Sequence, residues 1–408
     1  MENLPIRRNT LLLSASLAMN SGMLQLSAAV ATITFVLVSG FEGLVGLGPA
    51  IVLGSGALAA LPAGRLMDRF GRVPVLAGGF AVGAAGGGFA ALGSVVDSTP
   101  VVLLGLLGVG VSGGTSLLAR TAAADMYPPS RRARGIALVL FGAVFGAILG
   151  PAVFSPLLAG RELDGDALAL LWLAGSAFTL AGLALVVFVR PDPRHLAELI
   201  APRAPDDPVV PAAPLREILG RSGVVPSILA AQASFGVMVG LMTLTGSVVV
   251  DHHGHAGHLV FPIIGAHVIG MYALVLVVGD VIDRIGRPPA LVGGLLLMAV
   301  SAGSLLWIES VPATAVALFG LGLGWNFSFV AATAQLADCT YAWERGKLLG
   351  FNDLLSGLTG AGLALLGGFA LSALGVAALA IGGTALVVAP AVWIARESRR
   401  PPAVPAAE

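Results

Sequence analysis

Apolar runs of about 20 residues recur along the whole chain, and they limit its possible folds more than any other feature. Hydrophobic residues make up 57% of the 408 residues and charged residues only 11%. A soluble domain carries about a quarter charged residues, so this chain cannot cover itself with a polar surface. As helices, the runs would cross the roughly 30 Å hydrocarbon layer, because each residue adds about 1.5 Å. The sequence therefore predicts an all-α polytopic membrane protein, and the lack of strand-like alternation disfavours a β-barrel.

The runs predict twelve transmembrane helices, six before and six after a stretch rich in proline and charge. The expected spans are 10–38, 43–64, 73–95, 99–124, 133–160, 167–189, 223–250, 258–279, 289–309, 311–337, 346–372 and 374–395. The expected domains are an N-terminal six-helix bundle at 1–190, a cytoplasmic linker at 191–222, a C-terminal six-helix bundle at 223–396 and a cytoplasmic tail at 397–408.

Lysine and arginine predict the orientation, because cytoplasmic loops carry an excess of these residues. With the N-terminus placed in the cytoplasm, 21 of the 22 lysines and arginines lie on the cytoplasmic side, and Arg161 is the exception. We therefore expect a multi-pass protein of the cytoplasmic membrane with both termini in the cytoplasm. The run at 10–38 is too long for the apolar core of a signal peptide, so we expect it to be retained.

Charge and cysteine content exclude several classes of function. The net charge is zero, which gives no indication of a nucleic-acid partner. Cys339 is the single cysteine, so an internal disulfide and a cysteine-based metal cluster are excluded. A membrane enzyme would need acids, histidines or cysteines that converge on one membrane face, and no such set stands out beyond one histidine-rich turn. We expect neither an enzyme nor a bound cofactor.

One charged stretch occurs twice, at equivalent places in the two halves. The sequence PAGRLMDRFGRVP at 62–74 joins expected spans two and three. A near copy, VVGDVIDRIGRPP at 277–289, joins expected spans eight and nine. The aspartates of the two copies, Asp68 and Asp283, are 215 residues apart.

A second repeat has nearly the same offset. The sequence AAADMYPPSRRARG at 122–135 follows expected span four, and AQLADCTYAWERGK at 334–347 follows span ten. Asp125 and Asp338 are 213 residues apart. Two independent matches at nearly the same offset predict two pseudo-symmetric six-helix bundles. Such repeats are typical of secondary transporters, which bind their substrate between the repeats near the membrane midplane.

The repeated loop resembles the signature of the major facilitator superfamily, which has glycine, aspartate-arginine, glycine and arginine at this spacing. In that family the aspartate caps the N-terminal end of a helix in the other half, and the last arginine pairs with an acid at the end of span four. The resemblance implies a cytoplasmic latch in which Asp68 meets the start of span eleven and Arg72 pairs with Asp125, with a mirrored set in the second half. The latch residues would be Gly64, Asp68, Arg69, Gly71, Arg72, Asp125, Gly279, Asp283, Arg284, Arg287 and Asp338. The alternative is that these charges only set the topology.

Polar residues inside the spans are candidates for a substrate cavity, because polar groups are costly in the bilayer. Ser21, Gln25 and Thr32 share one face of the first span. The other candidates are Gln232 and Thr243 in span seven, with Trp325 and Asn326 in span ten. The alternative role of each is a hydrogen bond between packed helices.

Two titratable residues inside spans are candidates for proton coupling. His267 lies about nine residues into span eight, and Asp353 is expected as a lone carboxylate at similar depth in span eleven. The alternative for His267 is a neutral side chain that hydrogen-bonds between helices. The alternative for Asp353 is a position near the cytoplasmic start of the span. Many drug–proton antiporters of the family carry an arginine in span four where this chain has Leu104, and span one has no acid. Antiport by that particular scheme is therefore disfavoured.

The turn DHHGHAGH at 251–258 holds four of the six histidines. Clustered imidazoles bind Zn²⁺, Ni²⁺ or Cu²⁺, so His252, His253, His255 and His258 are weak candidates for a metal site. A gating role or a solvated turn are the alternatives, and the spans lack a matching set of ligands.

Together these features predict a secondary active transporter of a small organic solute that works by rocker-switch alternating access. We expect a monomer in the lipid bilayer, with a slight preference for proton-coupled efflux of drug-like or amphipathic compounds. Weak support for export comes from Gly142, Gly146 and Gly150-Pro151, which match part of an efflux motif whose final glycines are replaced by Phe154 and Ser155. The alternatives are a divalent metal (Zn/Ni) exporter that uses the turn at 251–258, or an uptake permease for a neutral metabolite.

Overall fold

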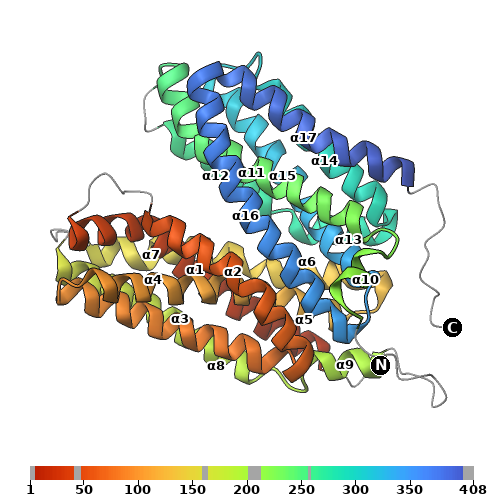
Figure 1. The fold of residues 1–408 in the computed structure, drawn as a ribbon, viewed down its shortest axis with the longest axis horizontal. Helices are drawn as coiled ribbons and strands as arrows, with labels where there is room; N and C mark the ends of the chain where they lie inside the picture. Colours follow the sequence, from red (N-terminus) through yellow and green to blue (C-terminus); the bar gives the residue numbers. More distant parts are fainter. Residues whose placement is uncertain (1–4, 41–46, 159–163, 201–212, 256–258, 398–408) are drawn as a thin grey trace. The chain divides into compact units, whose positions relative to one another are not determined.

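The structure, a computed structural model, describes residues 5–40, 47–158, 164–200, 213–255 and 259–397, which form helices and turns without a strand (Figure 1). The first half contains α1 (Ile6–Ser39), α2 (Leu47–Phe70), α3 (Arg72–Val95), α4 (Thr99–Leu117), α5 (Ala119–Met126), α6 (Arg132–Leu140), α7 (Gly142–Leu158), α8 (Gly165–Val187) and α9 (Pro193–Ile200). The second half contains α10 (Leu215–Leu219), α11 (Val224–Ser247), α12 (Val260–Tyr272), α13 (Val275–Ile285), α14 (Arg287–Ser304), α15 (Val311–Asp338), α16 (Ala342–Leu374) and α17 (Val376–Glu397).

Each of the twelve expected spans contains one long helix or two consecutive helices. Length and composition mark nine described helical stretches as able to cross a membrane. A tenth is added when α12 and α13, which are bent by 42° at their junction, count as one span. The long helices α1 and α14 occupy the other two expected positions. The predicted all-α membrane fold is confirmed.

Glycine determines where two pairs of helices turn. Gly71 separates α2 from α3 with φ of 101°, and Gly286 separates α13 from α14 with φ of 91°. Side chains rarely tolerate this backbone region, so glycine is the residue that allows the turn. In the second case Pro288 and Pro289 follow at the start of α14, where the missing N–H has no helical partner to lose.

The chain divides into two compact units. The first unit comprises the described residues of Met1–Pro128, Leu138–Val210 and Ala342–Gly357. The second comprises those of Pro129–Ala137, Pro211–Tyr341 and Leu358–Glu408. The first unit therefore includes the N-terminal half of α16, and the second unit includes the first turns of α6.

In the first unit, α1, α3, α4 and α8 pack around a buried apolar cluster that includes Met23, Leu26 and Leu106. Trp172 is fully buried in this cluster, and its Nε1 donates to Thr34 Oγ1 at 2.9 Å. A buried indole whose N–H is bonded carries no desolvation penalty from that group.

In the second unit, α15 packs against α12 and α14, and α17 packs on α14. Glycine brings two of these helices together, because a Cβ built at Gly324 would lie 2.7 Å from the carbonyl oxygen of Gly294. Close approach through small residues is the usual packing mode of membrane helices.

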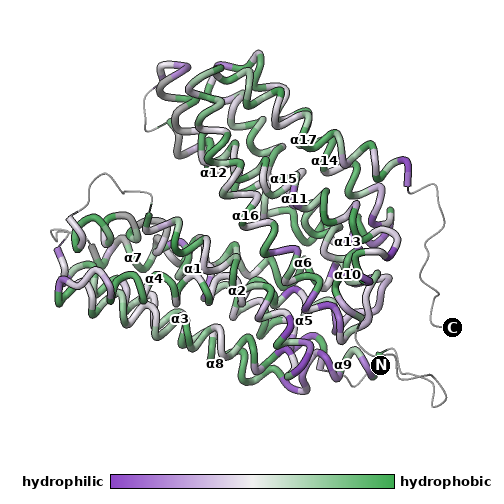
Figure 2. Tube along the Cα trace, in the orientation of Figure 1, coloured by the Kyte–Doolittle hydropathy of each residue, from purple (hydrophilic) through white to green (hydrophobic). Residues whose placement is uncertain are grey.

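Both units expose large apolar side chains on their long helices. Leu53 and Ile148 in the first unit are 66% and 63% exposed, and Val316 and Leu374 in the second are 71% and 73% exposed. In water such surfaces would cause association, whereas lipid covers them at no cost. Hydrophilic residues gather instead around α5 and α9 in the first unit (Figure 2).

Candidate functional site

Asp68, in the last turn of α2, caps the start of α16. Its two carboxylate oxygens accept hydrogen bonds from the backbone N–H of Gly346 at 2.9 Å and of Lys347 at 2.6 Å. Gly346 and Lys347 are the fifth and sixth residues of α16, close to the end of the helix that carries its positive dipole. A carboxylate from another helix thus adds two hydrogen bonds and a compensating charge near this end.

Two glycines allow α2 and α16 to approach closely enough for this cap. A Cβ built at Gly64 would lie 1.9 Å from the carbonyl oxygen of Gly346, and one built at Gly346 would lie 2.3 Å from that of Gly64. These atoms are backbone atoms that cannot rotate away. Glycine at both positions is therefore a condition for the contact between Asp68 and α16.

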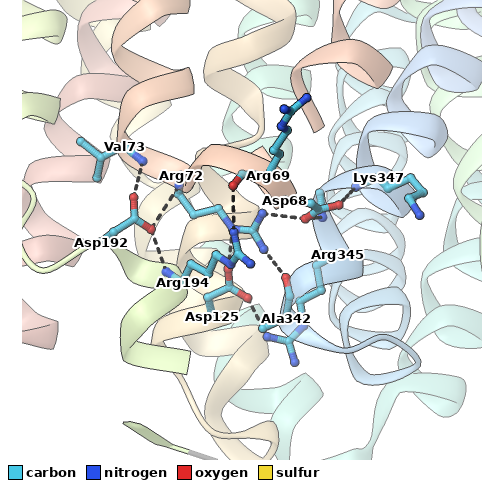
Figure 3. A network of polar contacts seen from close by, with 11 residues as sticks. Asp68, Arg69, Arg72, Val73, Asp125, Asp192, Arg194, Ala342, Arg345 and Lys347 are labelled. Atoms are coloured by element: carbon cyan, nitrogen blue, oxygen red, sulfur yellow. Dashed lines mark hydrogen bonds and ion pairs between the residues drawn. The ribbon is translucent and has the colours of Figure 1, made fainter. Parts of the chain in front are cut away.

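Arg72 joins the cap to a second carboxylate (Figure 3). Its Nη1 donates to Asp68 Oδ1 and its Nε donates to Asp125 Oδ2, both at 2.7 Å. Its guanidinium also donates to the carbonyl oxygen of Ala342, and Arg345 Nη1 donates to Asp125 Oδ1 at 2.6 Å. Arg72 and the Asp125 side chain are fully buried. Two carboxylates and two guanidinium groups compensate one another here, which buried charges require.

Asp192 anchors the chain after α8 to the same loop. Its carboxylate accepts hydrogen bonds from the backbone N–H of Arg72 at 3.1 Å and of Val73 at 2.8 Å, the first residues of α3. It also accepts one from the N–H of Arg194 at 2.9 Å, in the first turn of α9. One side chain therefore caps two helices.

The second unit repeats the arrangement of the first. Asp283 accepts hydrogen bonds from the backbone N–H of Ala133 at 3.2 Å and of Arg134 at 2.9 Å, in the first turn of α6. Arg287 donates to Asp283 through Nη1 and to Asp338 through Nε, both at 2.9 Å. These are the counterparts of the bonds made by Asp68, Arg72 and Asp125.

Further contacts complete the repeated arrangement. The Arg287 guanidinium donates to the carbonyl oxygen of Pro129, and Arg132 forms an ion pair with Asp338. A Cβ at Gly279 would lie 2.7 Å from Ala137 Cβ, so this glycine has the same packing role as Gly64.

The pairings implied by the family resemblance are thus present in both units. Arg69 and Arg284, the other two arginines of the motif, are exposed. The Arg69 guanidinium lies 5.0 Å from the ring centre of Phe70, a cation–π contact at the surface. Sequence reasoning missed Arg345 and Asp192. The Asp192-Pro193 pair is a helix-start signal for α9, but no sequence signal indicates that Asp192 also caps α3.

The expectation of a lone carboxylate at Asp353 is wrong. The Arg120 guanidinium donates to Asp353 Oδ1, and both residues belong to the first unit. Arg120, at the end of expected span four, is one of the 21 cations that the charge count places on the cytoplasmic side. All eight residues of α5 are buried, however, and Arg120 is 0% exposed. His267 is also fully buried, and its Nδ1 hydrogen-bonds with the carbonyl oxygen of Leu318 at 2.9 Å.

The candidate cavity residues of the first unit have different surroundings. Ser21 Oγ donates to the carbonyl oxygen of Ala143 in α7 at 3.0 Å, a hydrogen bond between packed helices. Gln25 is exposed, and the Thr32 side chain lies outside the described residues.

In the second unit, Thr359 Oγ1 donates to Gln232 Oε1 at 3.4 Å, and Thr243 bonds within its own helix. Trp325 stacks on Phe329 with ring centres 4.7 Å apart and is 6% exposed. Asn326 is 1% exposed, and within the described residues its Nδ2 and Trp325 Nε1 have no hydrogen-bond partner. Two buried donors on neighbouring residues can be satisfied by a ligand with acceptor atoms.

The described part of the histidine-rich turn contains His252, His253 and His255, and His258 lies outside it. The rings of His253 and His255 are 6.3 Å apart, and His255 Nε2 hydrogen-bonds with the carbonyl oxygen of Glu309 at 2.7 Å. Burial lowers the pKa of His253 below its usual value, against the opposing effect of Glu309. Over the described residues, no group of three or more His, Cys, Asp or Glu is placed to hold a metal ion.

Long apolar helices with the same carboxylate-capped loop in each half define, over the described residues, a membrane transporter built from two repeats. The comparisons with known proteins then identify the family. The model of the Major Facilitator Superfamily matches residues 10–266 and 256–408, so the chain belongs to this family. The predicted family is confirmed, and the chain is a multi-pass membrane transporter and not an enzyme.

Individual relatives agree with the family. The uncharacterized MFS-type transporter YdeG of Bacillus subtilis is 32% identical over 367 residues, which cover 87% of this chain and 84% of that protein. The riboflavin transporter RfnT of Brucella anthropi is 34% identical over 302 residues, 73% of each chain. Among solved structures, the proton:xylose symporter XylE has a TM-score of 0.77 at 14% identity, over 96% of this chain and 95% of that chain. At that identity the likeness concerns the fold alone.

Proposed function

We propose that this chain is a secondary transporter that moves a small organic solute by rocker-switch alternating access between two six-helix bundles. The observation that carries the proposal is the duplicated cap, in which Asp68 holds the start of α16 and Asp283 holds the start of α6. Each cap joins a loop of one half of the sequence to a helix start of the other half. The motif residues therefore act as a latch that keeps the cytoplasmic side closed until the helix starts are released.

The latch can be both firm and reversible. Hydrogen bonds to a charged group contribute about 1.5–3 kcal/mol each, and the cap of each helix start has two of them. When the cap opens at the cytoplasmic surface, water replaces the lost partners of the carboxylate and of the helix N–H groups. A difference of a few kcal/mol between the closed and open states is within the range that a ligand shifts by binding one state better.

The substrate class follows from the candidate cavity residues. Gln25, Gln232 and Asn326 offer amides, and Trp325 offers an aromatic wall with a buried, unbonded N–H among the described residues. Neutral donors and an aromatic face suit a neutral or amphipathic compound with a planar ring and acceptor atoms. The RfnT relative, by its name, transports riboflavin, which has this chemistry. We therefore propose riboflavin as the first compound to test, alongside drug-like amphipathic compounds, with His267 and Asp353 as proton-coupling groups.

The proposal includes the orientation and assembly that the sequence predicts. We propose that both termini lie in the cytoplasm, that residues 1–190 and 223–396 form the two bundles, and that the protein acts as a monomer. The metal-export alternative has less support, because no three His, Cys, Asp or Glu side chains among the described residues, those of the turn included, are placed to hold a metal ion.

The first experiment is a melting screen of the purified protein against riboflavin, a panel of amphipathic drugs, ZnCl₂ and NiCl₂, because a ligand that binds the folded state raises the melting temperature. The compound that raises it is then tested for transport in proteoliposomes. We expect Asp68→Asn and Asp283→Asn to lower the transport rate, since an amide has one acceptor oxygen for the two helix N–H groups and turns its NH₂ donor toward the other. Asp280→Asn, which changes an exposed acid outside the caps, is the matched control. Wild-type rates in both cap variants would contradict the latch, and a shift with metals alone would favour metal export.

A further inference from the structure

A second buried ion pair lies beyond the latch, between α5 and the first half of α16. The Arg120 guanidinium donates to Asp353 Oδ1, and the two residues are 0% and 8% exposed. Asp353 follows Lys347 by six residues, which places it roughly 9 Å further along α16 than the cap made by Asp68. The pair is therefore separate from the latch network, although it holds the same helix.

The charged groups of the latch next to this part of α16 have their own ion-pair partners. Asp68 of α2 pairs with Arg72 of α3, and Arg345 of α16 pairs with Asp125 of α5. The helix α1, which also packs on α5, presents the uncharged Asn9 and Asn20 as buried polar residues. The cation that the structure places on Asp353 is Arg120.

The repeat shows that the latch does not require this pair. The offset of 213 residues that relates Asp125 to Asp338 relates Arg120 to Thr333. The N–H groups bound by Asp68, those of Gly346 and Lys347, match those bound by Asp283, of Ala133 and Arg134, at the same offset of 213, which relates Asp353 to Leu140. The second half of the pseudo-symmetric structure therefore has the cap without the extra ion pair. The Arg120–Asp353 ion pair is therefore not required to form a cap of this kind.

We infer that Arg120 and Asp353 form a proton-linked lock on the cytoplasmic side, an inference that rests on the alternating access proposed above. While α16 is held, Asp353 is ionised beside Arg120. When α16 separates from α5, the carboxylate loses its cation at a depth where an unpaired charge is costly. Asp353 then takes up one proton from the cytoplasm, and Arg120 keeps its charge and becomes hydrated. Closing reverses both steps, so acidification of the cytoplasmic side favours opening.

The test uses a cysteine as a reporter of opening. Ala57 of α2 is 8% exposed and is covered by Gly357 of α16, whose Cβ, if present, would lie 2.4 Å from Ala57 Cβ. In Cys339→Ser protein, the Ala57→Cys substitution introduces a single thiol. A membrane-impermeant maleimide is applied to the cytoplasmic side of inside-out vesicles between pH 8 and pH 6. Each rate is divided by that of the denatured protein at the same pH, which removes the titration of the thiol itself.

We expect the normalised labelling rate to rise about tenfold from pH 8 to pH 6 in the parent protein. It should be independent of pH in Asp353→Asn and in the charge-free double variant Arg120→Gln/Asp353→Asn. The double variant leaves no unpaired buried charge, so it can replace the single variant in this test if the single variant does not fold. Asp280→Asn is the control that should keep the pH dependence. A pH dependence that persists unchanged in both Asp353 variants would overturn the inference.

A further arm separates this inference from the proposed latch. Asp68→Asn should raise labelling at every pH, because it weakens the cap without touching the proton acceptor. If it does so while both Asp353 variants keep the pH dependence of the parent, only the proton-linked lock fails. If Asp68→Asn leaves labelling unchanged, the latch itself fails. Ala60→Cys, at a residue that is 1% exposed and touches Gly350 of α16, provides a second reporter.

Discussion

Replacing Gly64 with alanine should release the start of α16 without changing any charge. The new Cβ would lie 1.9 Å from the carbonyl oxygen of Gly346, whereas carbon–oxygen contacts lie at about 3.3 Å or more. Since the obstructing atom is backbone, α16 has to move by about 1.4 Å to restore an ordinary contact.

That movement is enough to break the cap. The hydrogen bonds from Gly346 and Lys347 to Asp68 are 2.9 and 2.6 Å long, and a displacement of this size puts both beyond the usual limit of about 3.2 Å. Each is worth about 1.5–3 kcal/mol, so the closed state loses about 3–6 kcal/mol relative to the open state. Because about 1.4 kcal/mol is a factor of ten, even a partial loss should raise the open population at least tenfold.

The reporter at position 57 measures this population. We expect Gly64→Ala to raise maleimide labelling from the cytoplasmic side at least tenfold at pH 7. Gly54→Ala is the matched control, because it lies in the same helix and a Cβ there meets no atom within 4 Å. It should leave labelling unchanged and stabilise α2 by about 0.5–1 kcal/mol. Equal labelling in the two variants would refute the reasoning.

Two further predictions concern residues outside the caps of α16 and α6. Asp192→Ala should lower the melting temperature, since replacing a helix-capping side chain by alanine costs about 1 kcal/mol and Asp192 caps both α3 and α9; an unchanged melting curve would show that water substitutes for it. Cys339 should react slowly with maleimide at pH 7, because burial, and then the charge of Asp338, raises the pKa of its thiol to about 11. The thiolate is the reactive form, so the rate should rise about tenfold per pH unit up to that value, and a plateau near pH 8.5 would contradict it.

The sequence predicts the helices and both caps for a physical reason. Span positions follow from apolar runs that the bilayer requires, and these patterns are local. The repeat then predicts long-range contacts, because Asp68 and Asp283 occupy equivalent positions in the two halves and so do Asp125 and Asp338. One family motif therefore implies two sets of contacts.

The contacts that could not be read from the sequence have no counterpart in the repeat or in a local pattern. Arg120 and Asp353 are 233 residues apart, and the residues that match them in the other half are Thr333 and Leu140. Arg120 is also close in sequence to a cluster of loop cations. A count of positive residues therefore groups it with the loop, although all eight residues of α5 are buried. The sequence at Asp192-Pro193 predicts a cap for α9. The contact between Asp192 and the first residues of α3 depends on tertiary packing, which no local pattern indicates.

The most direct test of the account is to prevent α16 from leaving the first unit. Cysteines at Ala57 and Gly357 in Cys339→Ser protein can form a disulfide after a shift of about 1 Å, because a Cβ at Gly357 would lie 2.4 Å from Ala57 Cβ and bonded pairs are about 3.5–4.5 Å apart. Transport of the compound found in the melting screen is then measured in proteoliposomes before and after reduction. We predict that the oxidised protein does not transport and that reduction restores the rate. Transport at the full rate with the disulfide intact would contradict alternating access through release of α16.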